Sequence, residues 1–161
     1  PKSGADLDAR LVALVDRVTR RMRSSGRAGR TVTLRLRFGD FSRATRSRTL
    51  PHVTDGTGAI LAAARNLLGA AAPMIEHRGI TLIGVAVTNL AGRGYGAQLE
   101  LPLDRPLDAA LDAAIDEVRD RFGPDSIRRG ASLARDPGLS PWLRPGEEPP
   151  SPEPPASGAQ A

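Results

Sequence analysis

Residues 30–50 read RTVTLRLRFGDFSRATRSRTL, and this stretch decides the fold. In its first half, threonine or arginine alternates with an apolar residue; the apolar positions are Val32, Leu34, Leu36 and Phe38. A period of two with β-branched residues is typical of a strand that buries one face. Gly39-Asp40 predicts a turn, and residues 41–50 form a second predicted strand that ends at Pro51. The short connection favours an antiparallel hairpin.

Helices and one further strand are predicted around the hairpin. Apolar residues recur at spacings of three and four in three segments, as they do on one face of a helix. These segments are residues 6–23, 57–72 and 107–122, and residues 79–90 read as a third strand. Thr54 or Asp55 is placed to cap the start of the second helix. The expected fold is α+β, an antiparallel sheet with two helices packed on one face, followed by an extra helix.

The C-terminal part of the chain differs in composition. Residues 136–161 hold 8 prolines and few apolar residues, so this Pro-rich tail is expected to be disordered. The predicted organisation is a nucleic-acid-binding sheet domain over residues 6–91, a linker and short extended peptide over 92–103, a helical extension over 104–135, and the tail over 136–161.

Composition excludes several classes of function. The chain of 161 residues has no cysteine, so disulfides, thiol catalysis and cysteine zinc sites are excluded. No apolar run approaches the roughly 20 residues of a membrane span. We therefore expect a cytoplasmic protein without a membrane partner.

The acids and histidines show no catalytic arrangement. Asp108, Asp112, Asp116 and Asp120 lie four residues apart on one face of a predicted helix. Such carboxylates would repel one another, and we interpret them as a solvated face opposite the apolar stripe. His52 and His77 have no cysteine or second histidine at ligand spacing. The sequence thus predicts no catalytic residue and no metal site.

Arginines give the strongest functional signal. The net charge is +9 over residues 1–103 (16 Lys and Arg against 7 Asp and Glu) and −4 over residues 104–161 (7 against 11). Arg35 and Arg37 share one strand face, and Arg46 and Arg48 share another, so hairpin pairing is expected to bring all four onto one open face. Guanidinium groups match phosphate oxygens bidentately, and nearby hydroxyls add neutral contacts. Because aromatics are only 3% of residues, a base-stacking platform is disfavoured, and the pattern predicts binding to a duplex backbone.

The hairpin also resembles a known family. Residues 37–50, RFGDFSRATRSRTL, are similar to the F-x-D-F-x-x-x-T-R-S-x-T-L stretch of the bacterial DNA polymerase IV group of Y-family translesion polymerases. Arg78-Gly79-Ile80 and Leu82-Ile83-Gly84-Val85 resemble the start of the last strand in the C-terminal "little finger" domain of that group. The resemblance covers roughly residues 7–103 and continues more weakly to about Leu133.

The resemblance implies a role in gripping DNA. In that family the little finger lies along the major groove of the primer–template duplex and touches both backbones. The positions implied to contact phosphate are Arg46, Ser47, Arg48 and Thr49, with Arg35 and Arg37 as neighbours.

A second implied element is a partner peptide. Residues 98–103, QLELPL, resemble the Q-L-x-L-x-L peptide by which the family binds the bacterial sliding clamp. The implied contacts are Gln98, Leu99, Leu101 and Leu103. On its residues alone, this stretch also reads as an ordinary strand.

The chain departs from the family pattern in two ways. The catalytic palm, with its Mg²⁺-binding carboxylates, is absent. This chain is therefore expected to need no cofactor and to be inactive alone. The resemblance implies that the parent protein is an error-prone DNA-directed DNA polymerase acting in DNA repair. The strand that opens the family's domain is not supplied convincingly by residues 1–6. Alternatives are a stand-alone basic nucleic-acid adaptor and a protein-interaction domain with incidental arginines. A monomer is expected.

Overall fold

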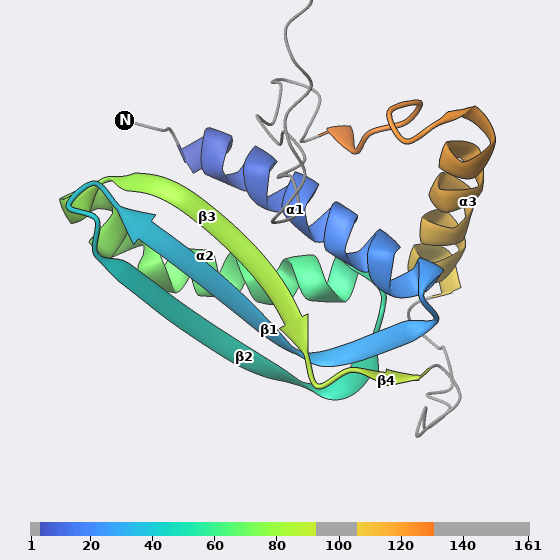
Figure 1. The fold of residues 1–161 in the computed structure, drawn as a ribbon, viewed down its shortest axis with the longest axis horizontal. Helices are drawn as coiled ribbons and strands as arrows, with labels where there is room; N and C mark the ends of the chain where they lie inside the picture. Colours follow the sequence, from blue (N-terminus) through green and yellow to red (C-terminus); the bar gives the residue numbers. More distant parts are fainter. Residues whose placement is uncertain (1–3, 93–105, 131–161) are drawn as a thin grey trace, which may run out of the picture.

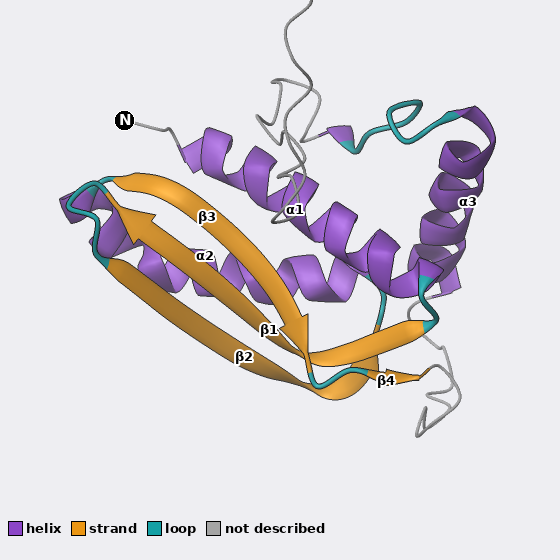
Figure 2. Ribbon diagram, in the orientation of Figure 1, coloured by secondary structure: helices purple, strands orange, loops and turns teal. Residues whose placement is uncertain are grey.

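The computed structural model describes residues 4–92 and 106–130. The elements follow in the order α1 (Gly4–Ser24), β1 (Arg27–Phe38), β2 (Arg43–Thr54), α2 (Thr57–Arg78), β3 (Ile80–Thr88), β4 (Ala91–Gly92) and α3 (Pro106–Phe122) (Figure 1). The predicted α+β fold is confirmed: α1 and α2 lie on one side of an antiparallel sheet, and α3 stands at the end of the two helices (Figure 2).

The sheet is centred on β1. Its strand order is β2-β1-β3, with both pairings antiparallel, and the short β4 pairs with the N-terminal end of β1. The four-residue connection from Gly39 to Ser42 places Arg37 opposite Arg43, and this pairing sets the register of the hairpin. Within the described residues, β2 and β3 each pair with β1 alone, so each presents an edge.

The core lies between the sheet and the two helices. The apolar positions of β1 that the alternation predicted to face inward are all buried. They pack with one stripe from each helix, which comprises Leu11, Val15 and Met22 of α1 and Ile60, Ala63, Ala64 and Ala71 of α2. Small residues dominate the α2 stripe, and small side chains allow close approach between a helix and a sheet. The opposite face of the sheet carries no helix in the described part of the chain (Figure 2).

The helix α2 runs six residues beyond its predicted end at residue 72. Pro73 lies inside it, and proline removes one backbone donor from a helix. Met74 and Ile75 pack against the core, and this tertiary contact offsets the local cost. By length and composition alone α2 could cross a membrane, a property that the core helices of soluble proteins share. Its buried stripe faces the sheet.

The strand β2 also exceeds its predicted length. It continues through Pro51 to Thr54, whereas Pro51 was expected to end it. An edge strand tolerates proline because its outward backbone positions have no ladder partner. Residues 93–105 and 131–161 lie outside the described residues, and with them the extended peptide at 98–103 and the Pro-rich tail.

Candidate nucleic-acid interface

The open face of the sheet carries hydroxyls at one end and arginines at the other. The outward residues of β1 are Thr31, Thr33, Arg35 and Arg37. The residues paired with them on β2 are Thr49, Ser47, Thr45 and Arg43, and those on β3 are Thr88, Ala86, Gly84 and Leu82. Residues directly opposite each other in an antiparallel sheet point to the same side. This set of 12 positions, called the open face below, is therefore one continuous surface.

Three arginines gather at the hairpin end of the open face. Arg37 and Arg43 are a directly paired cross-strand couple, and Arg35 lies one outward position away on β1. Like charges in such positions repel and destabilise a sheet. Among the described residues none of the three forms an ion pair with a carboxylate. A cluster that costs stability and has no internal counter-charge fits an external anion.

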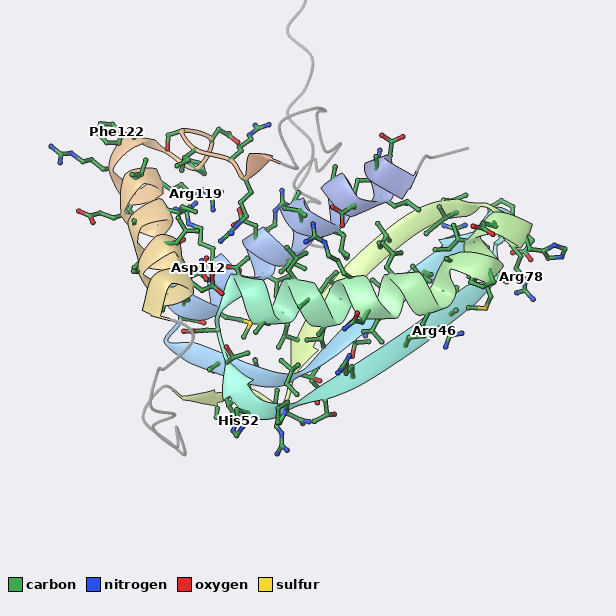
Figure 3. All side chains as sticks on the ribbon, turned by 180° about the vertical axis from the view of Figure 1, so that it is seen from behind. Arg46, His52, Arg78, Asp112, Arg119 and Phe122 are labelled. Atoms are coloured by element: carbon green, nitrogen blue, oxygen red, sulfur yellow. The ribbon has the colours of Figure 1, made fainter. Side chains whose placement is uncertain are left out.

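Arg46 and Arg48 do not lie on the open face, so the expectation that four arginines emerge together is wrong. Arg46 pairs with Leu34 and Arg48 with Val32, whose side chains are buried on the helix side. Both arginines remain exposed because they extend from the edge strand beside α2, as Figure 3 shows for Arg46. The cause is the register, which pairs even-numbered residues with even-numbered residues.

Hydroxyls fill the rest of the open face between β1 and β2. Thr31 and Thr49 are hydrogen-bonded through their hydroxyls at 3.1 Å, and Thr33 and Ser47 likewise at 3.1 Å. The predicted contact residues Ser47 and Thr49 therefore lie on the open face. Gly84 has no side chain and that of Ala86 is a single methyl group, so neither residue projects far above β3. A large rigid surface can therefore approach this part of the open face closely.

Arg43 is the open-face cation that the sequence interpretation missed. Its position follows from the register alone, since it stands opposite Arg37. The apolar residues Ala44 and Leu50 of the second strand indicate which of its faces is buried, and both pack against the core. Arg46 and Arg48 lie between them at even-numbered positions, so they project to the same, helix-covered side.

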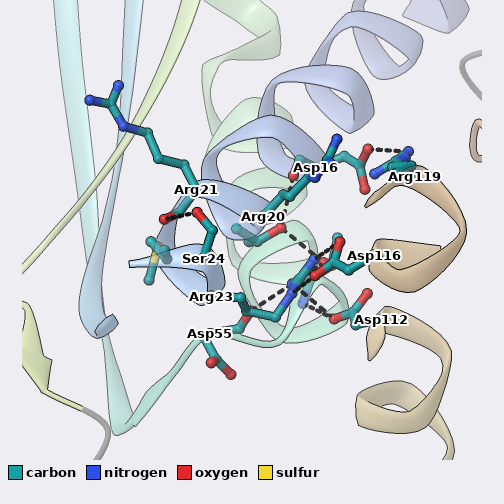
Figure 4. A network of polar contacts seen from close by, with 12 residues as sticks. Asp16, Arg20, Arg21, Arg23, Ser24, Asp55, Asp112, Asp116 and Arg119 are labelled. Carbon is teal, nitrogen blue, oxygen red and sulfur yellow. Dashed lines mark hydrogen bonds and ion pairs between the residues drawn. The ribbon is translucent and has the colours of Figure 1, made fainter. Parts of the chain in front are cut away.

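A second cluster of charges joins α3 to the ends of α1 and α2. Arg23 of α1 donates from Nε to Asp116 at 2.6 Å and from Nη1 to Asp112 at 3.3 Å (Figure 4). Arg119 of α3 pairs with Asp16 at 2.7 Å, and Arg20 pairs with Asp120 at 2.8 Å. Three of the four aspartates predicted to share one face of this helix, Asp112, Asp116 and Asp120, are thus ion-paired. Their interpretation as a solvated face was wrong for Asp112, which is 3% exposed.

Burial and ion pairing act oppositely on Arg23. Its side chain is 9% exposed, and burial by itself disfavours the charged guanidinium. The hydrogen bond to Asp116 and the charges of Asp112, Asp116 and Asp55 outweigh burial, so the pKa of Arg23 is raised above its ordinary value. Arg23 therefore stays charged, and its guanidinium group is paired with carboxylates of α3 and is not available to an external ligand.

Asp112 also completes the start of α2. Gly56 occupies the N-cap position and offers no side-chain hydrogen bond, so neither Thr54 nor Asp55 fills the capping role expected of them. Asp112 Oδ2 instead accepts a hydrogen bond from the Thr57 backbone N–H at 2.8 Å. A carboxylate at a helix N-terminus satisfies an unpaired donor and complements the helix dipole. The cap comes from another element, 55 residues away in sequence.

The ion pairs restrict where the positive charge is available. Arg20 and Arg23 are paired with α3, and Arg65 is paired with Asp8 at 2.8 Å. Arginines on the sheet lack such carboxylate partners among the described residues, so their charge is available to an external anion. Within residues 4–92 and 106–130, no group of three or more His, Cys, Asp or Glu residues is arranged to hold a metal ion.

Comparison with known proteins gives the family. The model of the impB/mucB/samB family C-terminal domain matches residues 2–101. A DNA polymerase IV of Moorella thermoacetica is 39% identical over 128 residues, which are 80% of this chain and 31% of that protein. A DNA polymerase IV of Streptomyces coelicolor is 44% identical over 78 residues, which are 48% of this chain and 16% of that protein.

These matches cover less than a third of each relative's length. The family model ends before α3, but a match of 128 residues within a chain of 161 spans α3 wherever it begins. The helix is therefore included in the similarity to the Moorella protein. The chain belongs to the impB/mucB/samB family and carries the C-terminal, little finger domain of the Y-family DNA polymerase IV group.

Proposed function

We propose that this chain grips the backbone of a primer–template duplex on its open face, as the little finger of an error-prone translesion DNA polymerase IV. The observation that carries the proposal is the cluster of Arg35, Arg37 and Arg43. Its members repel one another across the strands and have no carboxylate partner among the described residues. Phosphates would relieve that repulsion.

The chemistry of the open face suits a backbone rather than base edges. Guanidinium forks donate two parallel hydrogen bonds to phosphate oxygens, and threonine and serine hydroxyls add uncharged ones. The open face carries no amide side chain among its 12 positions, and amides are the groups that read adenine. The hydroxyls beside the arginines favour contacts to phosphate and sugar, which carry no sequence information, so we expect binding to depend little on sequence.

Arg46 and Arg48 extend the grip around the edge of the sheet. They project to the helix side of β2, while Ser47 and Thr49 project to the open face. A phosphate strand that follows this edge would meet hydroxyls on one side and guanidinium groups on the other. The outward backbone N–H groups of an edge strand offer further donors.

The remaining activities belong to the whole polymerase. We infer that DNA synthesis takes place on a Mg²⁺-binding palm elsewhere in the parent protein, in the cytoplasm. We infer further that Gln98, Leu99, Leu101 and Leu103 bind the bacterial sliding clamp. The support for the clamp peptide is its sequence and its position between β4 and α3.

The test is a matched pair of double variants with equal loss of charge. Arg35→Ala with Arg37→Ala should weaken binding to a labelled duplex and reduce the slope of log K against log salt by about 1 to 2, because each lost phosphate contact lowers it by about 0.9. Arg121→Ala with Arg128→Ala removes two cations from α3 and the segment after it, and it should leave the slope unchanged. Equal effects from the two double variants would show that only net charge matters and would refute the proposed interface.

A further inference from the structure

The tip of the β1–β2 hairpin exposes a phenylalanine. Phe41 is 72% exposed, although burial of such a side chain would be favourable. Its φ is +62°, in the left-handed region that bulky residues rarely adopt. The side chain is thus displayed at some cost in both solvation and backbone energy.

Several contacts hold the tip in this conformation. Phe38 N–H donates to the Ser42 carbonyl at 2.9 Å, and Phe41 N–H donates to the Phe38 carbonyl at 3.1 Å. Gly39 N–H donates to the Arg78 carbonyl at 3.2 Å, which ties the tip to the end of α2. Asp40 accepts from the Ser42 hydroxyl and backbone N–H, and these hydrogen bonds lower its pKa. The tip is a preorganised support for the ring.

One guanidinium group lies over the Phe41 ring. The Arg37 guanidinium lies over it, 4.9 Å from the centroid. Arg37 projects from the open face, so the ring sits at the hairpin end of that face, where Arg43 is paired with Arg37. Arg78 lies near the same turn, with Nη1 3.4 Å from the Ser42 hydroxyl. An aromatic ring with a guanidinium group over it, at the arginine-bearing end of the open face, matches a ligand that has both a π face and negative charge.

We propose that Phe41 is a stacking site for an unpaired nucleobase next to the duplex held on the open face. The inference rests on the proposed function and adds to it a contact with a base. The base stacks on the exposed ring, while Arg37 and Arg43 bind the flanking phosphates. Charge complementarity selects nucleic acid over an apolar protein partner, because Arg37 lies over the ring and Arg43 is paired with Arg37 at the same end of the open face.

The structure provides a matched control for this site. Phe122, at the end of α3, is 69% exposed and has the Arg121 guanidinium 5.5 Å from its ring centroid. It therefore repeats the exposure and the arginine neighbour of Phe41, but on the acidic helix away from the sheet (Figure 3). Trp142 is the single tryptophan, so Trp142→Phe gives a background without tryptophan fluorescence.

The first experiment measures stacking directly. Phe41→Trp and Phe122→Trp are each made in the Trp142→Phe background and titrated with a blunt duplex and with the same duplex bearing a single-stranded overhang. Fluorescence of the tryptophan at position 41 should be quenched by the overhang duplex and much less by the blunt one, and that at position 122 by neither. Equal quenching at position 41 by both duplexes would overturn the assignment to an unpaired base.

The second experiment measures affinity. Phe41→Ala should weaken binding of the overhang duplex about 5- to 10-fold, since one stacked base is worth at least about 1 kcal/mol, and should change blunt-duplex affinity less than about 2-fold. Phe122→Ala should change neither. If wild-type protein binds the blunt duplex but Phe41→Ala affects both duplexes equally or not at all, the stacking site is refuted while the proposed function stands. If wild-type protein binds neither duplex, the proposed function itself fails.

Discussion

Asp112 of α3 accepts a hydrogen bond from the backbone N–H of Thr57, the first residue of α2, at 2.8 Å. The same carboxylate oxygen lies 3.3 Å from Nη1 of Arg23, the penultimate residue of α1. The Asp112 side chain therefore caps the N-terminus of α2 and forms an ion pair with the C-terminal turn of α1. This makes α3 a structural part of the domain although it follows a segment outside the described residues.

Replacing Asp112 should destabilise the domain more than replacing any other α3 carboxylate. Asp112→Ala removes the cap of α2 and leaves the buried Arg23 with less counter-charge. Breaking one partner of a buried ion pair costs about 3 to 5 kcal/mol, and Asp116 still neutralises Arg23, so we expect a loss of about 3 kcal/mol. The measurement is the free energy of unfolding in urea.

Asp120 supplies the control for that measurement. It pairs with Arg20 at 2.8 Å, but its side chain is 75% exposed, and exposed pairs contribute at most about 1 kcal/mol. Asp120→Ala should therefore change the free energy of unfolding by less than about 1 kcal/mol. A similar loss in both variants would mean that α3 docks through net charge alone.

Thr19 and Thr57 should be energetically coupled. Their hydroxyls lie 2.9 Å apart, and both residues are fully buried. Thr19 donates to the Val15 carbonyl at 3.0 Å, so its single hydrogen is used and Thr57 must be the donor to Thr19. Arg23, which can only donate, fills the acceptor site of Thr57 at 3.1 Å.

A double-mutant cycle tests this chain of hydrogen bonds. Thr19→Val strands the buried Thr57 hydroxyl and should cost about 1 to 3 kcal/mol. Thr19→Val with Thr57→Val removes both groups, so its cost should fall short of the sum of the single variants by about 1 kcal/mol. Additive losses would contradict the coupling between the two hydroxyls.

The buried face of β1 was predictable because the alternation of apolar and polar residues that determines it lies within the strand itself. Alternation in residues 31–38 identifies the buried face of β1, and the structure buries those four apolar residues. The second strand lacks alternation of its own, so its facing depends on the register. That register follows from a four-residue connection, whereas the sequence suggested a turn at Gly39-Asp40 only, and this difference moved Arg46 and Arg48 to the other side.

The docked face of α3 was not predictable from periodicity. The apolar stripe predicted for this helix comprises Leu107, Leu111, Ile115, Val118 and Phe122, and of these Leu111 and Phe122 are exposed. The side that docks carries Asp112 and Arg119, both buried, with Ile115 between them. The partner surface is the arginine-bearing end of α1, and an apolar pattern within α3 holds no information about a charged surface elsewhere in the chain.

The Asp8–Arg65 pair predicts a small dependence of stability on pH. The hydrogen bond from Arg65 lowers the pKa of Asp8 below 3.8 in the folded protein. A group with a lowered folded pKa stabilises the fold above its unfolded pKa of about 3.9 and loses that contribution as pH falls through the folded value. Both side chains are partly exposed, so the contribution is below about 1 kcal/mol.

Asp8→Asn isolates this contribution. Wild type should be more stable than Asp8→Asn at pH 7, and the difference should shrink as the pH falls below the ordinary pKa of aspartate and the carboxylate becomes protonated. Thermal unfolding of the two proteins across this range is the measurement. If the difference in stability persisted at low pH, it would arise from packing or from hydrogen bonding by the neutral side chain, and not from the charge of Asp8.

Substitutions within residues 98–103 can test whether this peptide binds the sliding clamp. Gln98→Ala with Leu101→Ala should abolish capture by a bacterial sliding clamp and leave duplex affinity unchanged, because both side chains are proposed to fill the clamp's site. Glu100→Gln changes an intervening position and should preserve capture. Capture that survives the double variant, measured by surface plasmon resonance on immobilised clamp, would reject the peptide.

The two sides of β2 should differ in how their contacts respond to salt. Arg46→Ala with Arg48→Ala should weaken duplex binding about equally across sequences and lower the salt slope by about 1 to 2, since guanidinium–phosphate contacts release counterions. Thr33→Val with Ser47→Ala removes a hydroxyl pair of the open face and should weaken binding modestly with an unchanged slope, since neutral donors displace no counterion. An unchanged slope in the arginine variant would confine the interface to the open face, where Arg35, Arg37 and Arg43 would be its only cations among the described residues.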